Sequence, residues 1–396
     1  MIIKPRTRGF ICTTAHPEGC ARQVEQQIDY VEKQPAISGP KNVLVIGAST
    51  GYGLASRIVA AFGARANTVG VYRPSAASAT RTASAGWYNS AAFEQAAQAA
   101  GLKSFSVTGD ALSAETKSKT AELISRELGQ VDLVIYSVAT ARRTDPATGQ
   151  NRNSVLKPIG KPYSNKTVNF HTGEISMVTL EPASEQEIAD TVHVMGGEDW
   201  QDWIHVLENA GALAKNAVTV AYSYIGSQIT LPIYREGTIG QAKDHLEHTA
   251  QELTTQLSGI GGRAYVVVSK ALVTQSSSAI PVVPLYMSAL YKTMKEKGIH
   301  EGTIQQMYRL FADRLYGQNT PPLDEAGRIR LDDWEMRDDV QAEVTKLWDE
   351  LNSDNIYQLS DLEGFRREFF QLFGFEVDGV DYEADTDPVV EVPNAN

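Results

Sequence analysis

The sequence predicts an α/β protein whose mostly parallel, doubly wound sheet is covered by helices on both faces. Short apolar runs rich in valine and isoleucine alternate with stretches of helical length, a pattern typical of parallel strands that are buried on both faces. The composition agrees, because 42% of the 396 residues are hydrophobic and 21% are charged, which is the balance of a globular protein. Disorder and a coiled coil are therefore excluded.

Each predicted strand is an apolar run that is too short for a helix. The first run, Asn-Val-Leu-Val-Ile at 42–46, is rich in β-branched residues and leads directly into a glycine-rich turn, which favours a buried parallel strand. Similar runs recur along the chain. We predict strands over residues 42–46, 68–72, 104–107, 131–136, 217–222 and 264–268.

Stretches with apolar residues at helical spacing separate the strands and continue beyond the last one. We predict helices over residues 54–62, 115–128, 191–194, 200–212, 241–257, 284–297, 303–315, 338–351 and 359–373. Because strands and helices alternate without a linker of biased composition, we treat residues 1–396 as one extended domain.

Four parts of this domain differ in character. Residues 1–40 form a mixed leader, and residues 41–275 form the predicted sheet core. An insertion over 140–182 is polar and interrupted by proline and glycine, so we expect a hairpin there, over the edge of the sheet. Residues 276–376 are helical and are expected to cover a cleft, whereas residues 377–396 read as a loosely held acidic tail.

Charge and cysteine content limit the environment and the partners. The formal net charge is −12, so we expect no basic face for nucleic acid. No apolar run reaches ~18 residues, the length of a spanning helix, so stable membrane insertion is not expected. The N-terminus lacks the apolar core of a secretory signal. Cys12 and Cys20 are the two cysteines, and we interpret them as reduced thiols of a cytoplasmic protein.

The turn Gly47-Ala48-Ser49-Thr50-Gly51-Tyr52-Gly53 sits between a predicted strand and a predicted helix. Glycine at 47 permits a sharp turn, at 51 a close approach to a pyrophosphate, and at 53 close packing of the helix on the sheet. The following helix N-terminus presents free N–H groups to phosphates. The spacing favours a Rossmann-like fold of the short-chain dehydrogenase type that binds a dinucleotide, with an unliganded tight turn as the alternative.

Further cofactor contacts are expected where the later strands end. Arg73 follows the second strand, where an acid would favour NAD and a base NADP; it either holds a 2′-phosphate or is a solvated cation. Asp110 follows the third strand and either bonds the adenine edge or caps the next helix. The full set at the strand ends is Arg73, Pro74, Asp110, Ala111, Val138, Ala139, Leu272, Val273 and Thr274.

Tyr234 and Lys243 form the predicted catalytic pair. They lie nine residues apart, with Gly237 and Gly240 between them, so we expect the tyrosine in a loop and the lysine in the first turn of a helix. A lysine beside a phenol lowers its pKa from ~10 and can bond the nicotinamide ribose. Tyr224 lies at a strand end by the same cleft, where it either touches substrate or packs. No histidine, cysteine and carboxylate pattern indicates a metal site.

These residues resemble the trans-2-enoyl-CoA reductases, a family that includes the bacterial single-chain enoyl-acyl-carrier-protein reductases. The likeness spans nearly the whole chain and is carried by many motifs in order. They are Ile3–Pro5, Arg8–Cys12, Ala15–Cys20, Gly47–Gly53, Gly86–Asn89, Met195–Trp200, Ala221–Gly226, Tyr234 with Lys243, Met294–Gly298, His300–Gly302, Phe373–Phe375 and Gly379–Tyr382.

The resemblance implies NADH-dependent reduction of the C2–C3 double bond of trans-2-enoyl thioesters in fatty-acid metabolism. By the same resemblance, Tyr234 donates the proton, Lys243 binds cofactor and Tyr224 contacts substrate, while hydride reaches C3 and an enolate forms at the thioester oxygen. Enoyl-CoA or enoyl-acyl-carrier protein is the expected substrate partner, and we expect either a monomer or a homodimer. Members that prefer NADH usually carry a glutamate where this chain has Tyr72-Arg73-Pro74, so NADPH is an alternative cofactor.

Two other functions fit parts of the pattern. A ketone or alcohol oxidoreductase of the short-chain type would reduce simple ketones and ignore crotonyl-CoA. A dinucleotide sensor would bind cofactor without turnover, although the Tyr234 and Lys243 pair argues against it.

Overall fold

The computed structural model describes residues 1–9, 11–78, 80–145, 148–317 and 320–394. A seven-stranded parallel sheet forms its centre, in the order β13-β12-β11-β6-β3-β4-β5. Because β3 is central and the chain winds outward from it in both directions, the predicted doubly wound sheet is confirmed. The strands are β3 (Asn42–Ile46), β4 (Asn67–Tyr72), β5 (Ser104–Thr108), β6 (Val131–Tyr136), β11 (Leu213–Ser223), β12 (Arg263–Val268) and β13 (Ile329–Arg330).

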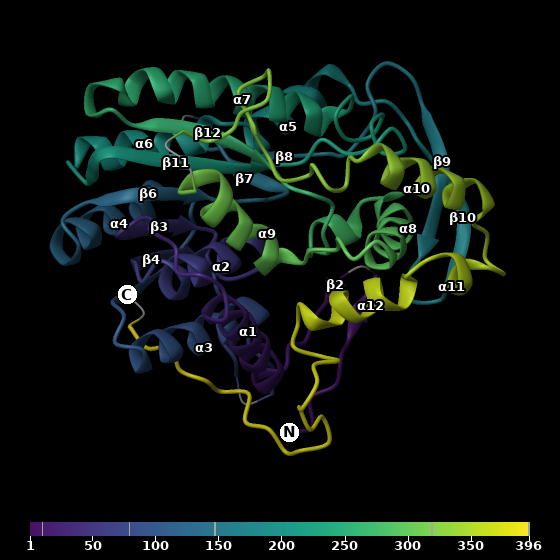
Figure 1. The fold of residues 1–396 in the computed structure, drawn as a ribbon, viewed down its shortest axis with the longest axis horizontal. Helices are drawn as coiled ribbons and strands as arrows, with labels where there is room; N and C mark the ends of the chain where they lie inside the picture. Colours follow the sequence, from purple (N-terminus) through teal and green to yellow (C-terminus); the bar gives the residue numbers. More distant parts are fainter. Residues whose placement is uncertain (10, 79, 146–147, 318–319, 395–396) are drawn as a thin grey trace.

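Helices cover both faces of this sheet (Figure 1). One face carries α1 (Pro17–Glu32), α2 (Gly51–Ile58), α3 (Ala85–Ala99) and α9 (Thr303–Arg309), and the other carries α4 (Ala114–Glu127), α6 (Glu198–Asn209) and α7 (Thr238–Gln256). The side chains of Val43, Leu44, Val45 and Ile46 are fully buried between these two layers, as expected for an apolar parallel strand.

Several predicted helices have different bounds in the structure. α2 begins at Gly51, three residues before the predicted start, and continues as a π-helical turn over Val59–Gly63. The predicted helix 303–315 is α9 followed by a π-helical turn over Leu310–Leu315. The residues predicted at 191–194 belong to a longer helix, α5 (Glu185–Met195), which starts at a Ser184 capping box. The first residues of α2 are glycines and a tyrosine, and the first residues of α5 are polar. Neither start carries an apolar periodicity, so both predicted starts came too late.

Among the described residues, the two long helices α1 and α3 were not predicted from the sequence, and neither was the four-residue helix α11 (Ile356–Leu359). α1 lies in the segment described as a leader, and buries Val24, Ile28 and Val31 on one side. These positions have helical spacing, but the intervening polar residues obscured it. α3 is rich in alanine, which gives little contrast between its buried and exposed faces.

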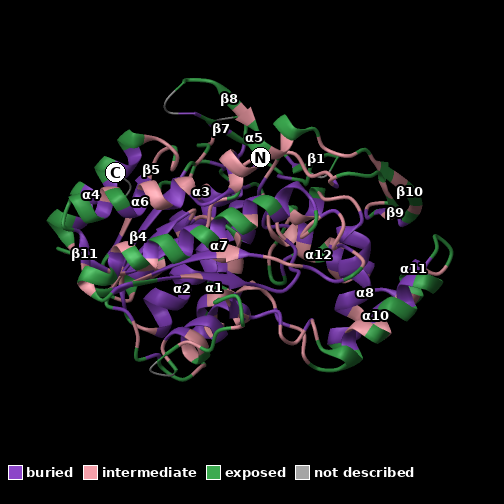
Figure 2. Ribbon diagram, turned by 90° about the horizontal axis from the view of Figure 1, so that it is seen from above, coloured by how far each residue is buried: buried purple, intermediate pink, exposed green. Residues whose placement is uncertain are grey.

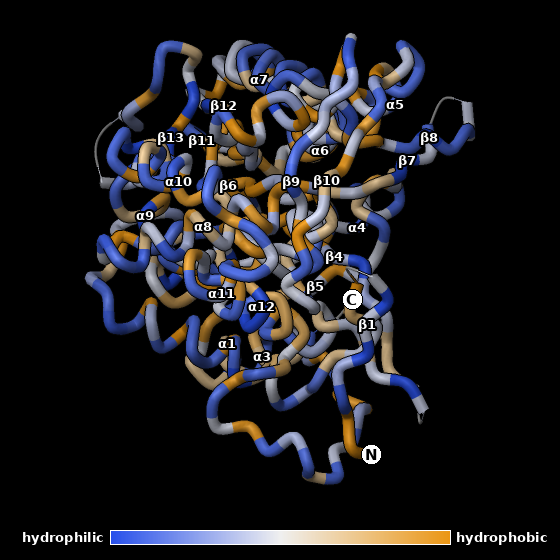
Figure 3. Tube along the Cα trace, turned by 90° about the vertical axis from the view of Figure 1, so that its right-hand side faces the viewer, coloured by the Kyte–Doolittle hydropathy of each residue, from blue (hydrophilic) through white to orange (hydrophobic). Residues whose placement is uncertain are grey.

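The insertion over 140–182 forms two antiparallel hairpins where we expected one. The first joins β7 (Arg142–Thr144) to β8 (Asn151–Asn153), and the second joins β9 (Tyr163–Asn169) to β10 (Glu174–Leu180). The described residues of the β7–β8 hairpin are hydrophilic and mostly exposed (Figures 2 and 3), although Arg143 is buried. The β9–β10 hairpin packs on the C-terminal helices.

A layer of helices lies beyond the carboxyl ends of the strands, at the right in Figure 1. It consists of α8 (Val283–Glu296), α10 (Asp338–Glu350), α11 (Ile356–Leu359) and α12 (Leu362–Gln371). These helices share a separate apolar core, with Met287, Val344 and Phe369 fully buried. A short hairpin of β1 (Thr7–Arg8) and β2 (Ile11–Cys12) lies near the start of the chain.

The acidic tail is not loosely held, which corrects the expectation from its charge. The Trp87 indole nitrogen donates to the Val390 carbonyl at 2.6 Å, and the Tyr88 hydroxyl donates to the Pro388 carbonyl at 2.7 Å. The tail therefore runs along α3, and its backbone carbonyls accept hydrogen bonds from side chains of that helix. A charge pattern in the sequence gives no information about such backbone contacts. Within the described ranges, no helix has both the length and the apolar character needed to cross a membrane.

Candidate active site

A cavity of about 1030 Å³ opens at the carboxyl ends of β3, β4, β6, β11 and β12. This is where open α/β sheets bind their ligands, because the loops that leave adjacent strands diverge there. Residues from the glycine turn lie at one side, and Tyr224, Tyr234 and Lys243 also line the cavity.

The glycine turn is packed so closely that two of its glycines admit no side chain. A Cβ atom on Gly47 would lie 2.1 Å from the Ser137 carbonyl oxygen, and one on Gly53 would lie 2.0 Å from the Gly47 carbonyl oxygen. Gly51 differs, because its φ is +54° and its missing side chain faces open space with Thr274 4.0 Å away. The turn therefore combines two tight backbone contacts with one open approach, as dinucleotide binding requires.

The first turn of α2 leaves backbone donors available beside this opening. Thr50 occupies the N-cap position without a side-chain capping bond, and it lines the cavity together with Ser49 and Gly51. Unpaired N–H groups and the helix dipole at such an end favour an anion. These observations fit a dinucleotide, with its pyrophosphate expected at this helix end.

Arg73 and Asp110 are brought together at the ends of β4 and β5. The Arg73 Nη1 atom lies 3.3 Å from Asp110 Oδ2, and Asp110 Oδ1 accepts a hydrogen bond from the Leu112 amide at 3.0 Å. Ser113, whose Oγ accepts from the Thr116 amide, caps α4, so the alternative of Asp110 as that cap is wrong. Both Arg73 and Asp110 line the cavity and are exposed to a ligand.

Both members of the predicted catalytic pair line the same cavity, although they lie nine positions apart in the chain. Tyr234 sits in the irregular turn before α7, and Lys243 lies in the second turn of α7 rather than the first, because the helix begins at Thr238. The Lys243 amine donates to the Tyr222 carbonyl at 3.1 Å. The Tyr224 and Tyr234 rings meet edge to face, with centroids 4.9 Å apart.

Burial dominates the ionisation of this pair. Burial lowers the pKa of Lys243 to about 8, an effect that Glu247 partly opposes. Burial also raises the pKa of Tyr234 to about 12, so the expected lowering of the phenol's pKa by the lysine is not found. Both groups are desolvated, which favours their neutral forms. Tyr234 is therefore a protonated phenol near neutral pH, able to give up a proton or donate a hydrogen bond.

Most predicted site residues line the cavity, and four do not. Ala48 and Gly53 are buried behind the glycine turn, and the Val273 amide donates to the Tyr291 hydroxyl at 3.0 Å. Pro74 is also not among the lining residues. Those that line the cavity are Gly47, Ser49, Thr50, Gly51, Tyr52, Arg73, Asp110, Ala111, Val138, Ala139, Tyr224, Tyr234, Lys243, Leu272 and Thr274.

Hydrogen bonds between residues of the loop after β12 hold that loop in place. The Thr274 amide and hydroxyl both donate to the Ser277 Oγ atom, at 2.9 and 3.1 Å. We expected an amide and a hydroxyl of this loop to hold the nicotinamide carboxamide; in this structure the Val273 amide and both Thr274 groups already have protein partners.

Sequence reasoning missed wall residues that come from distant segments. They include Cys12–Ala15 near the N-terminus, Ala83–Gly86 before and within α3, and Leu372 with Phe373 after α12. Cys12, Ala15, Gly86 and Phe373 belong to motifs that carry the family resemblance, but that resemblance assigned them no contact with a ligand. Within the described ranges, no three histidine, cysteine, aspartate or glutamate side chains are grouped to hold a metal ion.

The strand order, the glycine turn and the cavity at the strand ends define a dinucleotide-binding protein of the Rossmann type. Three family models match the chain: the NAD(P)H binding domain of trans-2-enoyl-CoA reductase over residues 2–79, the trans-2-enoyl-CoA reductase catalytic region over 81–316, and the enoyl reductase FAD binding domain over 323–386. The chain belongs to the trans-2-enoyl-CoA reductase family.

Curated relatives and solved structures agree along the full length. The chain is 59% identical to an enoyl-[acyl-carrier-protein] reductase [NADH] of Flavobacterium johnsoniae and 57% identical to a trans-2-enoyl-CoA reductase [NADH] of Ruminiclostridium cellulolyticum, covering 99% of both sequences in each case. It superposes on the Treponema denticola trans-2-enoyl-CoA reductase in complex with NAD with a TM-score of 0.94 and 48% identity. That match covers 98% of each chain. The corresponding Clostridium acetobutulicum enzyme, in complex with NADH, gives a TM-score of 0.95 at 45% identity, again over 98% of each chain.

The segment matched by the FAD-binding model does not fit a flavin in this chain. Its helices α10 and α12 pack tightly, with Val340, Val344 and Phe365 fully buried in one core with α8. From the matched segment, Leu372 and Phe373 line the cavity. A flavin ring would need to displace this core, so we derive no chemistry from FAD.

Proposed function

We propose that this protein reduces the C2–C3 double bond of trans-2-enoyl thioesters with NADH. The observation that carries the proposal is the meeting, in one cavity, of a glycine turn suited to a dinucleotide with the Tyr234 and Lys243 side chains. Full-length relatives with the names given above support the same reaction. The Tyr234 phenol is the acid, and Lys243 is the cation that lines the same cavity.

The cofactor-binding side is built from the glycine turn and the later strand ends. The turn and the first turn of α2 hold the pyrophosphate, Asp110 and Arg73 flank the adenosine, and the Lys243 amine bonds the nicotinamide ribose. The bound cofactor supplies the hydride for C3 of the substrate.

Tyr234 acts at the thioester oxygen. Tyr234 lines the cavity, and burial alone shifts the pKa of its hydroxyl, which has no hydrogen-bond partner among the described residues. The hydroxyl is therefore free to bond an acyl group. Because burial keeps the phenol protonated, it donates to the oxygen on which negative charge develops. The enolate then takes this proton at C2, which completes the acyl thioester and leaves Tyr234 as a phenolate. The cationic form of Lys243, in the same cavity, stabilises that charge.

The acyl chain is proposed to lie against the apolar wall of the cavity. This wall includes Ile280, Pro281, Val283 and Met287, from the segment leading into α8 and from α8 itself, and Leu372 and Phe373 from beyond α12. Met287 is also a fully buried core residue of α8, so its role is shared between the core and the cavity. An apolar wall excludes water and accepts methylene groups.

The carrier and the compartment follow as finer proposals. We propose that both CoA and acyl-carrier protein deliver the thioester, since relatives carry both names. Cys12 and Cys20 are free thiols, which supports a reducing compartment and hence the cytoplasm.

Turnover of NADH with crotonyl-CoA tests this function directly. We expect loss of NADH absorbance that depends on crotonyl-CoA and yields butyryl-CoA, with longer enoyl-CoA and enoyl-acyl-carrier protein tested in parallel. Simple ketones serve as the contrasting substrates. Reduction of ketones without reduction of crotonyl-CoA would instead assign a short-chain alcohol or ketone oxidoreductase, and cofactor binding without any turnover would assign a sensor.

A further inference from the structure

A fully buried carboxylate, Glu335, lies next to the candidate active site and has no role in the function proposed above. It belongs to the loop between β13 and α10 and is 0% exposed. Its oxygens accept hydrogen bonds from the Ala271 amide at 2.6 Å, the Tyr286 hydroxyl at 2.7 Å and the Tyr224 hydroxyl at 3.1 Å. A buried carboxylate is costly unless donors satisfy it in this way.

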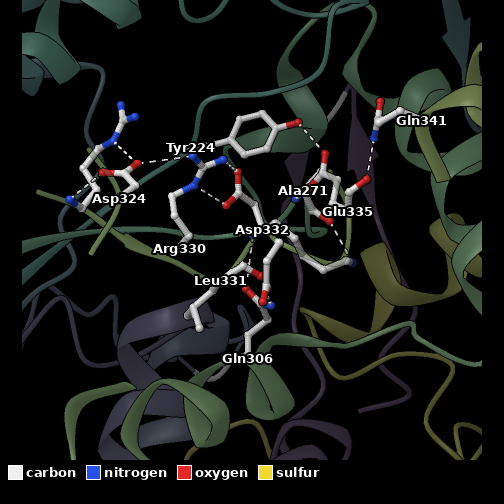
Figure 4. A network of polar contacts seen from close by, with 12 residues as sticks. Tyr224, Ala271, Gln306, Asp324, Arg330, Leu331, Asp332, Glu335 and Gln341 are labelled. Atoms are coloured by element: carbon white, nitrogen blue, oxygen red, sulfur yellow. Dashed lines mark hydrogen bonds and ion pairs between the residues drawn. The ribbon is translucent and has the colours of Figure 1, made fainter. Parts of the chain in front are cut away.

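The three donors come from three separate parts of the cavity's surroundings. Tyr224 follows β11 and lines the cavity, Ala271 opens the loop after β12 that carries Leu272 and Thr274, and Tyr286 lies on α8. Glu335 therefore joins the substrate side, the cofactor side and the covering helices through one carboxylate. Figure 4 shows the Tyr224 hydroxyl directed at this carboxylate.

The direction of the Tyr224 hydrogen bond matters for chemistry. Burial and the nearby Glu335 charge raise the pKa of Tyr224 well above its usual value, so Tyr224 keeps its proton. Burial raises the pKa of Glu335, whereas the Ala271 and Tyr286 hydrogen bonds lower it. With all three partners donating, the Tyr224 proton points to Glu335 and away from the cavity. Tyr224 then does not compete with Tyr234 as a donor to the thioester oxygen.

The same hydrogen bond fixes the ring that Tyr234 packs on. The two rings meet at an interplanar angle of 78° with centroids 4.9 Å apart, the edge-to-face geometry that aromatic pairs prefer. Since the Tyr234 hydroxyl has no protein partner within the described ranges, packing rather than hydrogen bonding sets its direction. An anchored Tyr224 ring therefore orients the Tyr234 phenol.

We propose that Glu335 is a positioning residue for the reduction: it anchors Tyr224, and Tyr224 in turn orients Tyr234. This inference rests on the proposed function, because it assigns Tyr234 the role of acid. It also gives the C-terminal segment matched by the FAD-binding model a part in the active site, through a carboxylate rather than a flavin.

Glu335→Gln tests the anchor because an amide cannot accept all three hydrogen bonds. If the NH2 group of the glutamine takes the place of Oε2, it faces the Ala271 N–H, and two donors oppose each other. If the NH2 group takes the place of Oε1, the Tyr224 and Tyr286 hydroxyls must both turn, and the Tyr224 proton then enters the cavity. Tyr224→Phe keeps the ring and removes the anchor from the other side. The two changes break the same link, so their effects on the rate should not add.

The experiment measures kcat with crotonyl-CoA and NADH, both saturating, for the full-length protein. We expect Glu335→Gln and Tyr224→Phe each to lower kcat by about tenfold, the scale of one hydrogen bond to a charged group. The double variant should lie within about twofold of the slower single variant. The KM for NADH should change much less than kcat, because the anchor acts on the acid.

Tyr286→Phe is the matched control, since it removes a phenol from the same carboxylate outside the cavity lining. It should change kcat by less than about threefold. If Glu335→Gln does not fold, Glu335→Asp replaces it: the shorter side chain keeps the charge, and the same lack of additivity with Tyr224→Phe is expected. Thermal unfolding of each variant reports on folding.

A product of the two single effects in the double variant, about 100-fold, would overturn the positioning role. So would a Glu335→Gln enzyme within about twofold of the unmodified rate. These failures differ from failure of the proposed function, in which the unmodified protein itself would not reduce crotonyl-CoA.

Discussion

At the scale of single residues, the chemistry depends on how burial changes two ordinary side chains. Tyr234 and Lys243 both line the cavity. Burial raises the pKa of the tyrosine and lowers that of the lysine, so it favours the neutral form of each side chain. Their residue types and their place after the fifth strand of the core were readable from the sequence. The sign of the tyrosine's pKa shift was not, because desolvation depends on the atoms that surround the ring.

Tyr234→Phe tests the acid. Removing the hydroxyl leaves the cavity shape almost unchanged but removes the donor at the developing charge, so we expect kcat to fall by about 10²-fold or more. The Kd for NADH, measured by fluorescence titration, should change little. Turnover equal to that of the unmodified protein would remove Tyr234 from the reaction.

Lys243 makes the rate depend on pH. Its amine is cationic below a pKa of about 8 and neutral above it, so kcat/KM for NADH should fall as pH rises through about 8. Lys243→Arg keeps the charge in this range, since arginine does not titrate below ~12, and its profile should stay level there. Lys270→Met is the control, because burial also lowers the pKa of Lys270 to about 8. In this variant, kcat/KM for NADH should still fall as pH rises through about 8. A fall that persists in Lys243→Arg would contradict the assignment.

Arg73 sets the choice between NADH and NADPH in this prediction. Its side chain is 76% exposed and pairs with Asp110 at 3.3 Å. Arg73→Glu should lower the ratio of kcat/KM for NADPH to that for NADH by about tenfold or more, because a carboxylate repels the 2′-phosphate. Arg126→Glu makes the same charge change on α4, where Arg126 contacts Glu127, and should leave the ratio unchanged. An equal ratio in both variants would make Arg73 an ordinary surface cation.

At the scale of elements, the first βαβ unit was the most predictable part of the fold. β3 has the predicted bounds, β4 begins one residue earlier than predicted, and the glycine turn joins β3 to α2 as expected. Apolar runs and glycine spacing are local signals, so local reasoning finds them. Helices α1 and α3 escaped it, because tertiary packing stabilises a weakly amphipathic helix that periodicity does not reveal.

Gly53→Ala tests the close contact within this unit. The new Cβ atom would lie 2.0 Å from the Gly47 carbonyl oxygen, so the turn must shift, and we expect the free energy of unfolding to fall by about 1–3 kcal/mol. NADH binding should weaken with it. Urea unfolding at unchanged m measures the first effect. Gly259→Ala, where a Cβ would meet nothing within 4 Å, is the matched control, and an equal loss in both variants would argue against a packing cause.

At the scale of the whole molecule, the cavity is assembled from segments that are far apart in the chain. Its wall includes Cys12–Ala15, Ala83–Gly86 and Phe373. The C-terminal tail supports the segment Ala83–Gly86. The Tyr88 hydroxyl accepts from the Ala83 amide at 2.9 Å and donates to the Pro388 carbonyl at 2.7 Å. The tail thus reaches the cavity wall through one tyrosine.

Truncation before Asp387 should therefore affect both stability and the site. It removes the acceptors of Trp87 and Tyr88, each hydrogen bond being worth about 1 kcal/mol, and we expect Tm to fall by a few degrees. Amide exchange of α3 should accelerate, and the KM for NADH should rise. Val389→Ala, at a tail position 56% exposed, should do neither. A truncated protein with unchanged Tm would show that the tail does not contribute to the fold.

The sequence by itself determined the α/β class, the glycine turn, the candidate pair Tyr234 and Lys243 and the family resemblance. These follow from patterns within one or two elements, or from motifs that need no coordinates. Only the tertiary structure decided the link from Glu335 to Tyr224, which joins positions 111 residues apart, and the docking of the acidic tail. Both depend on which donors meet which acceptors after the chain has folded, and the spacing of residues in the sequence does not predict these pairs.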